Sequence, residues 1–246
     1  MNFTYNAYKD LLLLLDKKGY YFVGYQGWEK YDKTVILRHD VDYSVEKAIK
    51  LAELEASIGV RSTYFVLLTS DFYNVFSEFT RRGLKNIKEM GHNIGLHFDE
   101  TCYGSNINLV HQIENELEVL SNVLDEKILA VSMHRPSNKT LKADYSISNG
   151  AVANSYGYQF FRNFKYLSDS RRCWRENVKN IVELEEYSRL QILTHAFWYH
   201  EEERSLEESI EDFICGGSLE RYDKMNKNFT DLKSVMLRNK VIQTNL

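Results

Sequence analysis

Two carboxylates stand close together where residues 38–42 read R-H-D-V-D. Asp40 and Asp42 are two positions apart, so on an extended chain they share a face, and they repel each other unless a proton or a cation separates them. A divalent metal bound to one aspartate, with the other left as a general base, would remove that repulsion. The alternative is a helix N-cap in which Asp42 and Ser44 accept hydrogen bonds from the next helix. Capping does not explain the whole run, so we favour a metal-dependent site.

A second group of polar residues lies in the segment 91–100, G-H-N-I-G-L-H-F-D-E. Alternation along a strand places His97 and Asp99 on one face, so both could point into the mouth of a barrel. A single histidine is more often a hydrogen-bonded structural residue than a ligand, but the neighbouring acidic groups favour His97 as a metal ligand. His92 stands at the start of the strand, at the end away from such a site.

Two further segments offer groups that could complete the site. His134 and Arg135 follow the apolar run 129–133, and Arg135 could hold a carboxylate in a fixed orientation. His134 is either a third metal ligand or an ordinary packed histidine. Around Asp169 the sequence reads S-D-S-R-R-C-W, which by itself is equally consistent with a helix cap.

His195 ends another apolar segment and is followed by aromatic residues. Such aromatics could form the floor of a site for a sugar, and a histidine paired with an aspartate could donate a proton to a leaving group. The alternative is an aromatic core cluster in which His195 is a hydrogen-bonded polar tip.

Other chemistries lack their sequence motifs. The chain contains no G-x-S-x-G, Walker A, G-x-G-x-x-G or H-E-x-x-H pattern. The three cysteines, Cys102, Cys173 and Cys215, are far apart and odd in number, which argues against a disulfide framework or a thiolate zinc site and fits a reducing cytosol. The acidic residues before Cys102 disfavour its thiolate, so a cysteine nucleophile is not expected.

The elements that position these residues alternate between strands and helices. Hydrophobic patterns and capping residues predict helices over 3–18, from Ser44 to Gly59, and over 72–90, 109–124, 174–184 and from 205 onward. Between them lie predicted strands at 34–39, 62–68, 92–98, 129–133, 151–156, 165–168 and 189–195. This alternation predicts βαβ units and a parallel sheet, in which about seven units favour a barrel. Active-site residues of such folds follow the strands, as the polar groups do here.

Composition narrows the function classes. The chain has 246 residues, a net charge of −4 and 43% hydrophobic residues, as expected for a globular protein without a basic surface for nucleic acid. No linker or repeat divides it, so we expect one domain over 1–246, with a helical extension at 1–33 and a helical cap at 201–246. The start lacks a secretory or membrane-spanning pattern, so a cytoplasmic location without membrane insertion is expected.

Taken in order, these segments are similar to those of the polysaccharide deacetylases of carbohydrate esterase family four, the NodB-like superfamily. The matching segments are 37–42 for T-F-D-D-G, 60–66 for A-T-F-F-V, 90–97 for G-H-E-I-G-x-H, 134–136 for F-R-P-P, 168–174 for the D-W region and 193–195 for L-x-H. The similarity runs from about residue 33 to 200. The R-H-D-V-D variant resembles a branch of the superfamily whose members often accompany surface-glycan biosynthesis genes.

This resemblance implies a distorted (β/α)7 barrel and the hydrolytic removal of an acyl group from an amino sugar with a divalent metal, usually zinc. Asp40 then corresponds to the general base and Asp42 to the metal-binding aspartate, although the inserted Val41 leaves the two interchangeable. His97 corresponds to the first histidine ligand.

The same resemblance implies roles for three residues beyond the metal. Arg135 would orient the base, Asp169 would pair with His195, and His195 would protonate the leaving amine. Trp174 and Trp198 are the candidate substrate-binding aromatics.

The chain departs from the family at one ligand. The second histidine ligand of the family lies four residues after the first, where this chain has Thr101. Zinc takes three protein ligands and an open position in catalytic sites, so Asp99, Glu100 or His134 must supply the third. We favour His134, with Asp99 as the alternative.

The sequence therefore predicts a metal-dependent hydrolase that removes an N-acyl group, in the first instance acetyl, from an amino sugar or glycan precursor. A deformylase or another linear amide hydrolase on the same fold is one alternative. A non-catalytic relative that binds a glycan or scaffolds a biosynthetic complex is the other, and Thr101 is the residue that favours it.

Overall fold

The computed structural model describes residues 1–104 and 107–243, and an interior strand of its sheet ends in the first four residues of the R-H-D-V-D run. This strand, β2 (Thr34–Val41), is buried along its whole length. It pairs in parallel with β3 (Thr63–Leu67) on one side and with β8 (Arg189–Thr194) on the other. Burial on both faces is typical of a parallel strand that is covered by helices.

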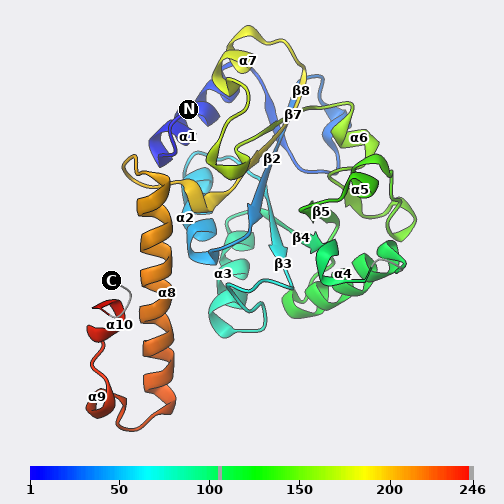
Figure 1. The fold of residues 1–246 in the computed structure, drawn as a ribbon. Helices are drawn as coiled ribbons and strands as arrows, with labels where there is room; N and C mark the ends of the chain where they lie inside the picture. Colours follow the sequence, from blue (N-terminus) through cyan, green and yellow to red (C-terminus); the bar gives the residue numbers. More distant parts are fainter. Residues whose placement is uncertain (105–106, 244–246) are drawn as a thin grey trace. The chain divides into compact units, whose positions relative to one another are not determined.

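Seven parallel strands follow one another around a curved sheet in the order β6-β5-β4-β3-β2-β8-β7. The remaining strands of this path are β4 (Asn93–Asp99), β5 (Ala130–His134), β6 (Ala153–Asn154) and β7 (Lys165–Ser168). A short additional strand, β1 (Tyr21–Val23), pairs with the first half of β2. Within residues 1–201 the longer helices lie outside the curved sheet (Figure 1). The architecture confirms the predicted distorted (β/α)7 barrel, and within the described residues no pairing joins β6 to β7.

The outer helices form a neighbouring series around the sheet, in the order α7, α1, α2, α3 and α4. Their bounds are α1 (Tyr5–Lys17), α2 (Val45–Ser57), α3 (Glu78–Glu89), α4 (Leu109–Leu124) and α7 (Val178–Leu184). Two short helices, α5 (Asn138–Lys142) and α6 (Tyr158–Phe161), lie in the connections. The hydroxyl of Ser44 accepts a hydrogen bond from the Lys47 amide, so Ser44 is the N-cap of α2 as predicted.

The first helix is part of the barrel wall. Leu11, Leu12 and Leu15 of α1 are fully buried, and the helix lies between α7 and α2. The residue before it, Thr4, is bridged in parallel to His200. The N-terminal segment therefore completes the layer of helices over the central strands.

A buried carboxylate ties β2 to this layer. Glu55 on α2 accepts hydrogen bonds from the hydroxyls of Tyr8, Ser62 and Tyr64, and from His39 Nε2 at 2.8 Å. Burial would raise the pKa of Glu55, but His39 and further hydrogen bonds lower it to about 2. The carboxylate is therefore charged, and it joins α1, α2, β2 and β3 behind the candidate site.

The chain divides into two compact units, Met1–Glu201 and Glu202–Leu246. The second unit contains α8 (Leu206–Asn228), α9 (Leu232–Val235) and α10 (Lys240–Gln243). Ser205 and Glu208 form a capping box at the start of α8, in agreement with the predicted helices from 205 onward. In the part of the chain that the structure describes, no helix is both long and apolar enough to cross a membrane. The single domain over 1–246 stays a prediction.

Some element bounds differ from those predicted. Helix α3 begins at Glu78 rather than at 72, because Ser77 caps it and residues 68–77 form a loop. Strand β6 has only two residues, and β1, α5 and α6 were not predicted. These elements are too short to show a periodic pattern of their own.

Candidate functional site

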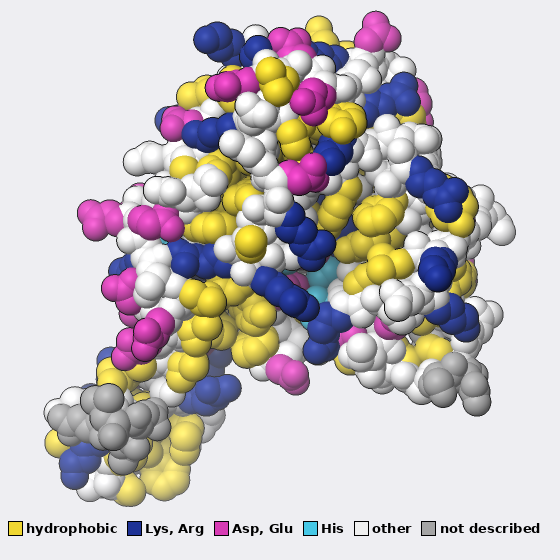
Figure 2. Space-filling view, turned by 45° about the horizontal axis from the view of Figure 1, so that its top comes forward, with side chains coloured by type: hydrophobic (Ala, Val, Ile, Leu, Met, Phe, Trp, Pro, Cys, Tyr) yellow, Lys and Arg dark blue, Asp and Glu magenta, His cyan; other side chains and the backbone are white. Residues whose placement is uncertain are grey.

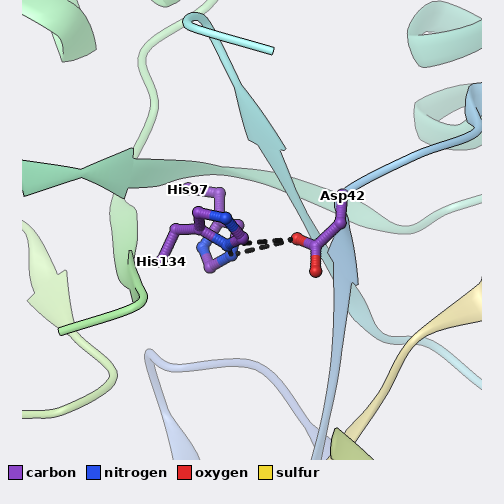
Figure 3. Close-up of side chains that lie close together, drawn as sticks. All are labelled: Asp42, His97 and His134. Atoms are coloured by element: carbon purple, nitrogen blue, oxygen red, sulfur yellow. Dashed lines mark hydrogen bonds and ion pairs between the residues drawn. The ribbon is translucent and has the colours of Figure 1, made fainter. Parts of the chain in front are cut away.

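Three potential metal ligands lie together at the C-terminal edge of the sheet. Asp42 Oδ1 is 3.3 Å from His97 Nε2 and 3.4 Å from His134 Nδ1, and the two nitrogens are 3.1 Å apart. The side chains point toward one another from the ends of three strands (Figure 3). One carboxylate and two imidazoles are ligands that zinc and related divalent ions accept. This trio, Asp42, His97 and His134, could hold a metal ion, and we call it the metal cluster.

The separations within the metal cluster fit a tetrahedral ion. Ligand atoms about 2.0–2.1 Å from a tetrahedral zinc lie roughly 3.3–3.4 Å from each other. Asp42 Oδ1 is also buried and makes no hydrogen bond within the described residues. A buried carboxylate oxygen without a hydrogen bond is costly, and a cation held jointly with the two imidazoles would satisfy it. The residues present therefore fit a divalent metal.

Strand pairing brings the three ligands together. Strand β3 lies between β2 and β4, with Val41 opposite Val66 and His97 opposite Leu67. His134 is in register with Asp99 at the ends of β5 and β4. All of these strands are parallel, so their carboxyl ends meet at one edge, as the prediction required.

A glycine makes room inside the sheet beside His97. Gly95 faces Phe65 on β3, and a Cβ added at Gly95 would overlap the Phe65 ring. The glycine of the G-L-H segment thus allows close packing across two strands.

The second nitrogen of His97 is held by a serine that the sequence analysis did not single out. His97 Nδ1 lies 2.6 Å from Ser132 Oγ, and the two residues are paired across β4 and β5. Such a bond fixes the ring orientation of a metal-ligating histidine. It leaves Nε2 facing the metal cluster. Ser132 stands two residues before His134, and the alternation along β5 could have indicated that both face the site.

The predicted general base has an arginine partner on its own strand. The Arg38 guanidinium binds both carboxylate oxygens of Asp40 at 2.8 Å, and both side chains are buried, with 0% and 4% exposure. Asp40 Oδ2 lies 3.5 Å from His97 Nε2, next to the metal cluster. Burial would raise the pKa of Asp40, but Arg38 and then His97 lower it. Asp40 is thus a charged and firmly oriented carboxylate.

Asp40 and Asp42 therefore occupy different environments. Asp42 faces the two imidazoles, and its pKa lies well below the usual value because His134 and His97 outweigh the effect of burial. Asp40 faces Arg38. This arrangement favours Asp42 as the ligand and Asp40 as the base, in the order predicted.

Arg135 contacts a different aspartate from the one predicted. Its Nη2 binds Asp99 and, at 3.3 Å, Thr101 Oγ1, and it makes no hydrogen bond to Asp40 within the described residues. The physical reason is the strand order, because β5 neighbours β4, which ends at Asp99, and not β2. The contact with Asp40 that was expected of Arg135 is made by Arg38 instead.

Asp99, the alternative third ligand, is engaged outside the metal cluster. Its Oδ1 accepts hydrogen bonds from the amide and the hydroxyl of Thr101. With Arg135 also bound, the carboxylate is already satisfied. Thr101, at the position of the family's second histidine, thus serves to hold Asp99.

His195 and Asp169 form a dyad on the other side of the metal cluster. His195 Nδ1 lies 2.6 Å from Asp169 Oδ1, and the His195 amide donates to the same carboxylate. Burial would lower the pKa of His195, but Asp169 and then Asp42 raise it to about 9. His195 Nε2 lies 3.7 Å from Asp42 Oδ2, so the protonated nitrogen faces the metal cluster. Asp169 is the N-cap residue of the following turn, η4 (Ser170–Arg172), but its side chain makes no capping hydrogen bond and binds His195 instead.

Aromatic residues that follow Asp42 and His195 in the chain lie close to one another. The Trp198 ring lies 6.1 Å from the ring of Tyr43, the residue after Asp42. Trp198 is almost buried, and its indole N–H has no hydrogen-bond partner within 1–104 and 107–243. Trp174 is half-buried in the loop after β7. The roles of both tryptophans in substrate binding stay predictions.

Comparison with known proteins gives structural neighbours only. No family model and no curated protein matches the sequence. Among solved structures, one neighbour is the Xyl-CE4 domain of a multidomain xylanase from the hindgut metagenome of Trinervitermes trinervoides, at 15% identity, with 68% of this chain and 75% of that chain covered and a TM-score of 0.43.

Two further neighbours have the same TM-score of 0.43. A family 4 carbohydrate esterase from Bacillus anthracis is 16% identical, and the match covers 91% of this chain and 84% of the esterase chain. A mutant of the peptidoglycan deacetylase PdaC from Bacillus subtilis is 12% identical and covers 79% of this chain and 87% of its own. At this level of similarity the chemistry of the site rests on its own residues.

Proposed function

We propose that the protein is a metal-dependent hydrolase that removes an N-acyl group, in the first instance acetyl, from an amino sugar or glycan precursor. The observation that carries the proposal is that a candidate metal site, a candidate base and a candidate acid lie next to one another. The metal cluster lies between the Arg38–Asp40 pair and the Asp169–His195 dyad. Amide hydrolysis needs a base for water, an acid for the departing nitrogen and a way to stabilise negative charge between them.

Each part of the site has one role in this proposal. A divalent metal, for which zinc is the first candidate, would acidify bound water and polarise the acyl carbonyl. Asp40 accepts the proton of the attacking water, and Arg38 keeps its carboxylate in position. His195 donates its Nε2 proton to the leaving nitrogen, while Asp169 holds the ring and stabilises the imidazolium.

The choice of an amino sugar as substrate rests on the order of the sequence motifs and on the aromatic residues that follow Asp42 and His195. The segments around Asp40, His97, Arg135 and His195 resemble those of polysaccharide deacetylases. The ring of Tyr43, the residue after Asp42, packs near Phe197 and Trp198, and aromatic rings of this kind suit the flat face of a pyranose. A cytoplasmic location belongs to the proposal, because the cysteines of the chain are free thiols.

Metal content measured by elemental analysis, on protein purified without chelator, is the first test. We expect about one zinc or similar ion per chain in the wild type. His97→Ala and His134→Ala should lose it. The matched control is His111→Ala, because His111 is exposed on α4, away from the site. Absence of metal from the wild type, even after zinc is added, would contradict the proposal and favour a glycan-binding or scaffolding relative.

Activity on N-acetyl and N-formyl amino sugars is the second test. Asp40→Asn and His195→Ala should each lower kcat by roughly 100-fold or more, with an unchanged far-UV circular dichroism spectrum. Near-wild-type turnover in either variant would refute the assigned mechanism. Faster release of formate than of acetate would identify the deformylase alternative.

A further inference from the structure

The carboxylates on the floor of the candidate site are paired, whereas the loops around its mouth carry exposed arginines. Asp40 is paired with Arg38 and Asp169 with His195, on either side of the metal cluster. Arg135 directly follows β5, and Arg171 follows β7 in the turn η4 (Ser170–Arg172). Figure 2 shows Lys and Arg side chains gathered around the hollow in which histidine side chains are visible. A substrate would meet positive charge at the rim before it reaches the floor.

Arg135 lies at the rim with most of its side chain open to solvent. The side chain is 65% exposed, and Nη2 is the atom that binds Asp99 and Thr101. A guanidinium has five N–H donors, so others remain for a ligand. Arg135 directly follows His134, a member of the metal cluster, at the end of β5, so its loop lies beside that cluster.

Arg171 is the second rim arginine. It stands two residues after Asp169, which holds His195, so its loop borders the dyad directly. The side chain is exposed and has neither an ion pair nor a hydrogen bond among the described residues. Its neighbour Arg172 lies over the ring of Phe3, with the guanidinium carbon 5.2 Å from the ring centre. Arg171 is therefore the arginine of this turn that remains available to a ligand.

Both rim arginines have a left-handed backbone conformation. The φ angles are 48° at Arg135 and 59° at Arg171. Side chains other than glycine adopt such angles rarely; in this chain Asp125 and Glu185 do so at helix C-caps, and Ser148, Asn149 and Arg172 do so in turns. No helix ends at either arginine. A conformation of this kind is retained where the surrounding structure and the function require the side chain in that place.

We propose that the substrate is an anionic amino sugar whose phosphate or carboxylate oxygens bind Arg135 and Arg171 at the rim. The inference rests on the proposed function and specifies its substrate. The planar guanidinium fork matches both kinds of oxyanion. Binding of the oxyanion at the rim would leave the uncharged acyl amide to enter the site and reach the metal cluster and His195.

Binding of product analogues tests the proposal without turnover. Isothermal titration calorimetry of the metal-loaded protein compares glucosamine 1-phosphate with methyl glucosaminide, which carries the same amine but no phosphate. Muramic acid compared with glucosamine tests a carboxylate in the same way. We expect one of the anionic ligands to bind roughly 10- to 100-fold more tightly than its uncharged counterpart. This advantage should shrink as salt is raised from about 50 to 500 mM.

Two matched variants assign the effect to the rim. Arg171→Gln should lose most of the advantage, and Arg82→Gln should keep it, because Arg82 is an exposed arginine on α3. Equal affinities for charged and uncharged ligands in the wild type would overturn the proposal, as would an unchanged advantage in Arg171→Gln. Whether phosphate or carboxylate is preferred identifies the source of the oxyanion. A failure to hydrolyse any N-acyl sugar would contradict the proposed function and leave this binding comparison intact.

Discussion

Removal of one partner from the Arg38–Asp40 pair should destabilise the protein strongly. Both groups are buried, and two hydrogen bonds of 2.8 Å join them. Arg38→Met leaves a charged carboxylate inside the barrel with no cation bound to it. Breaking a buried ion pair in this way costs about 3–5 kcal/mol. Part of this loss would be relieved by protonation of Asp40, whose pKa would rise once Arg38 is gone.

A double-mutant cycle separates the pair from its surroundings. We expect Arg38→Met and Asp40→Asn each to lower the free energy of unfolding by about 3 kcal/mol or more. The double variant should lose clearly less than the sum, with a coupling energy of at least about 2 kcal/mol. Urea unfolding at pH 7 in the presence of a chelator measures all four proteins without a contribution from bound metal.

The reasoning would be refuted if the two losses add to within about 0.5 kcal/mol, as they do for independent sites. An exposed pair provides the matched control. Glu46 and Lys50 lie 3.8 Å apart on α2 and are mostly exposed. The cycle of Glu46→Gln and Lys50→Met should give a coupling energy no larger than about 0.5 kcal/mol.

Two further predictions concern groups behind the site. Ser132→Ala should weaken zinc binding about 10- to 100-fold, because His97 loses the hydroxyl that orients its ring, whereas Ser132→Thr should retain the affinity. Competition with a chromophoric chelator measures the zinc affinity of both variants. An affinity of Ser132→Ala equal to that of the wild type would exclude an orienting role for Ser132. Burial and hydrogen-bond partners set the pKa of Glu55 at about 2, below the 4.5 of an ordinary glutamate, so its contribution to stability is complete above pH 4.5 and is lost as the pH falls from 4.5 toward 2. Between pH 6 and pH 3 the wild type should therefore lose about 2 kcal/mol more than Glu55→Gln in chemical unfolding; parallel losses in the two proteins would contradict this assignment.

Local signals predicted much of the fold. Ser44 caps α2 and the strand residues 34–39 lie within β2, because a capping hydroxyl and a run of buried residues act within a few positions of the chain. Strand β1 was not predicted, and β6 was predicted to be longer than it is. Pairing with β2 and with β5, rather than a pattern in their own sequences, defines these two strands. Tertiary context of this kind cannot be read from a local pattern.

The parts of the candidate site that lie at the ends of strands could be predicted from the sequence. Asp42, His97 and His134 follow three strands, and parallel pairing brings them together. The partner of Asp40 was within reach of the same reasoning, since alternation places Arg38 on the face of Asp40. The contact between Arg135 and Asp99 was not, because it depends on which strands are neighbours, and that order is a property of the whole sheet.

The alternation of polar residues along β2 also fixes how this strand is aligned with its neighbours. Arg38 and Asp40 face the interior of the barrel, and His39 between them faces outward to Glu55. In a parallel strand that is apolar on both faces, a shift by one residue exchanges similar side chains and is weakly opposed. Here such a slip would turn the Arg38–Asp40 pair toward the helices, away from Ser155 and His97, and would turn the His39 imidazole toward the interior, away from Glu55. The charged groups therefore select one register, and with it the position of Asp42 at the sheet edge.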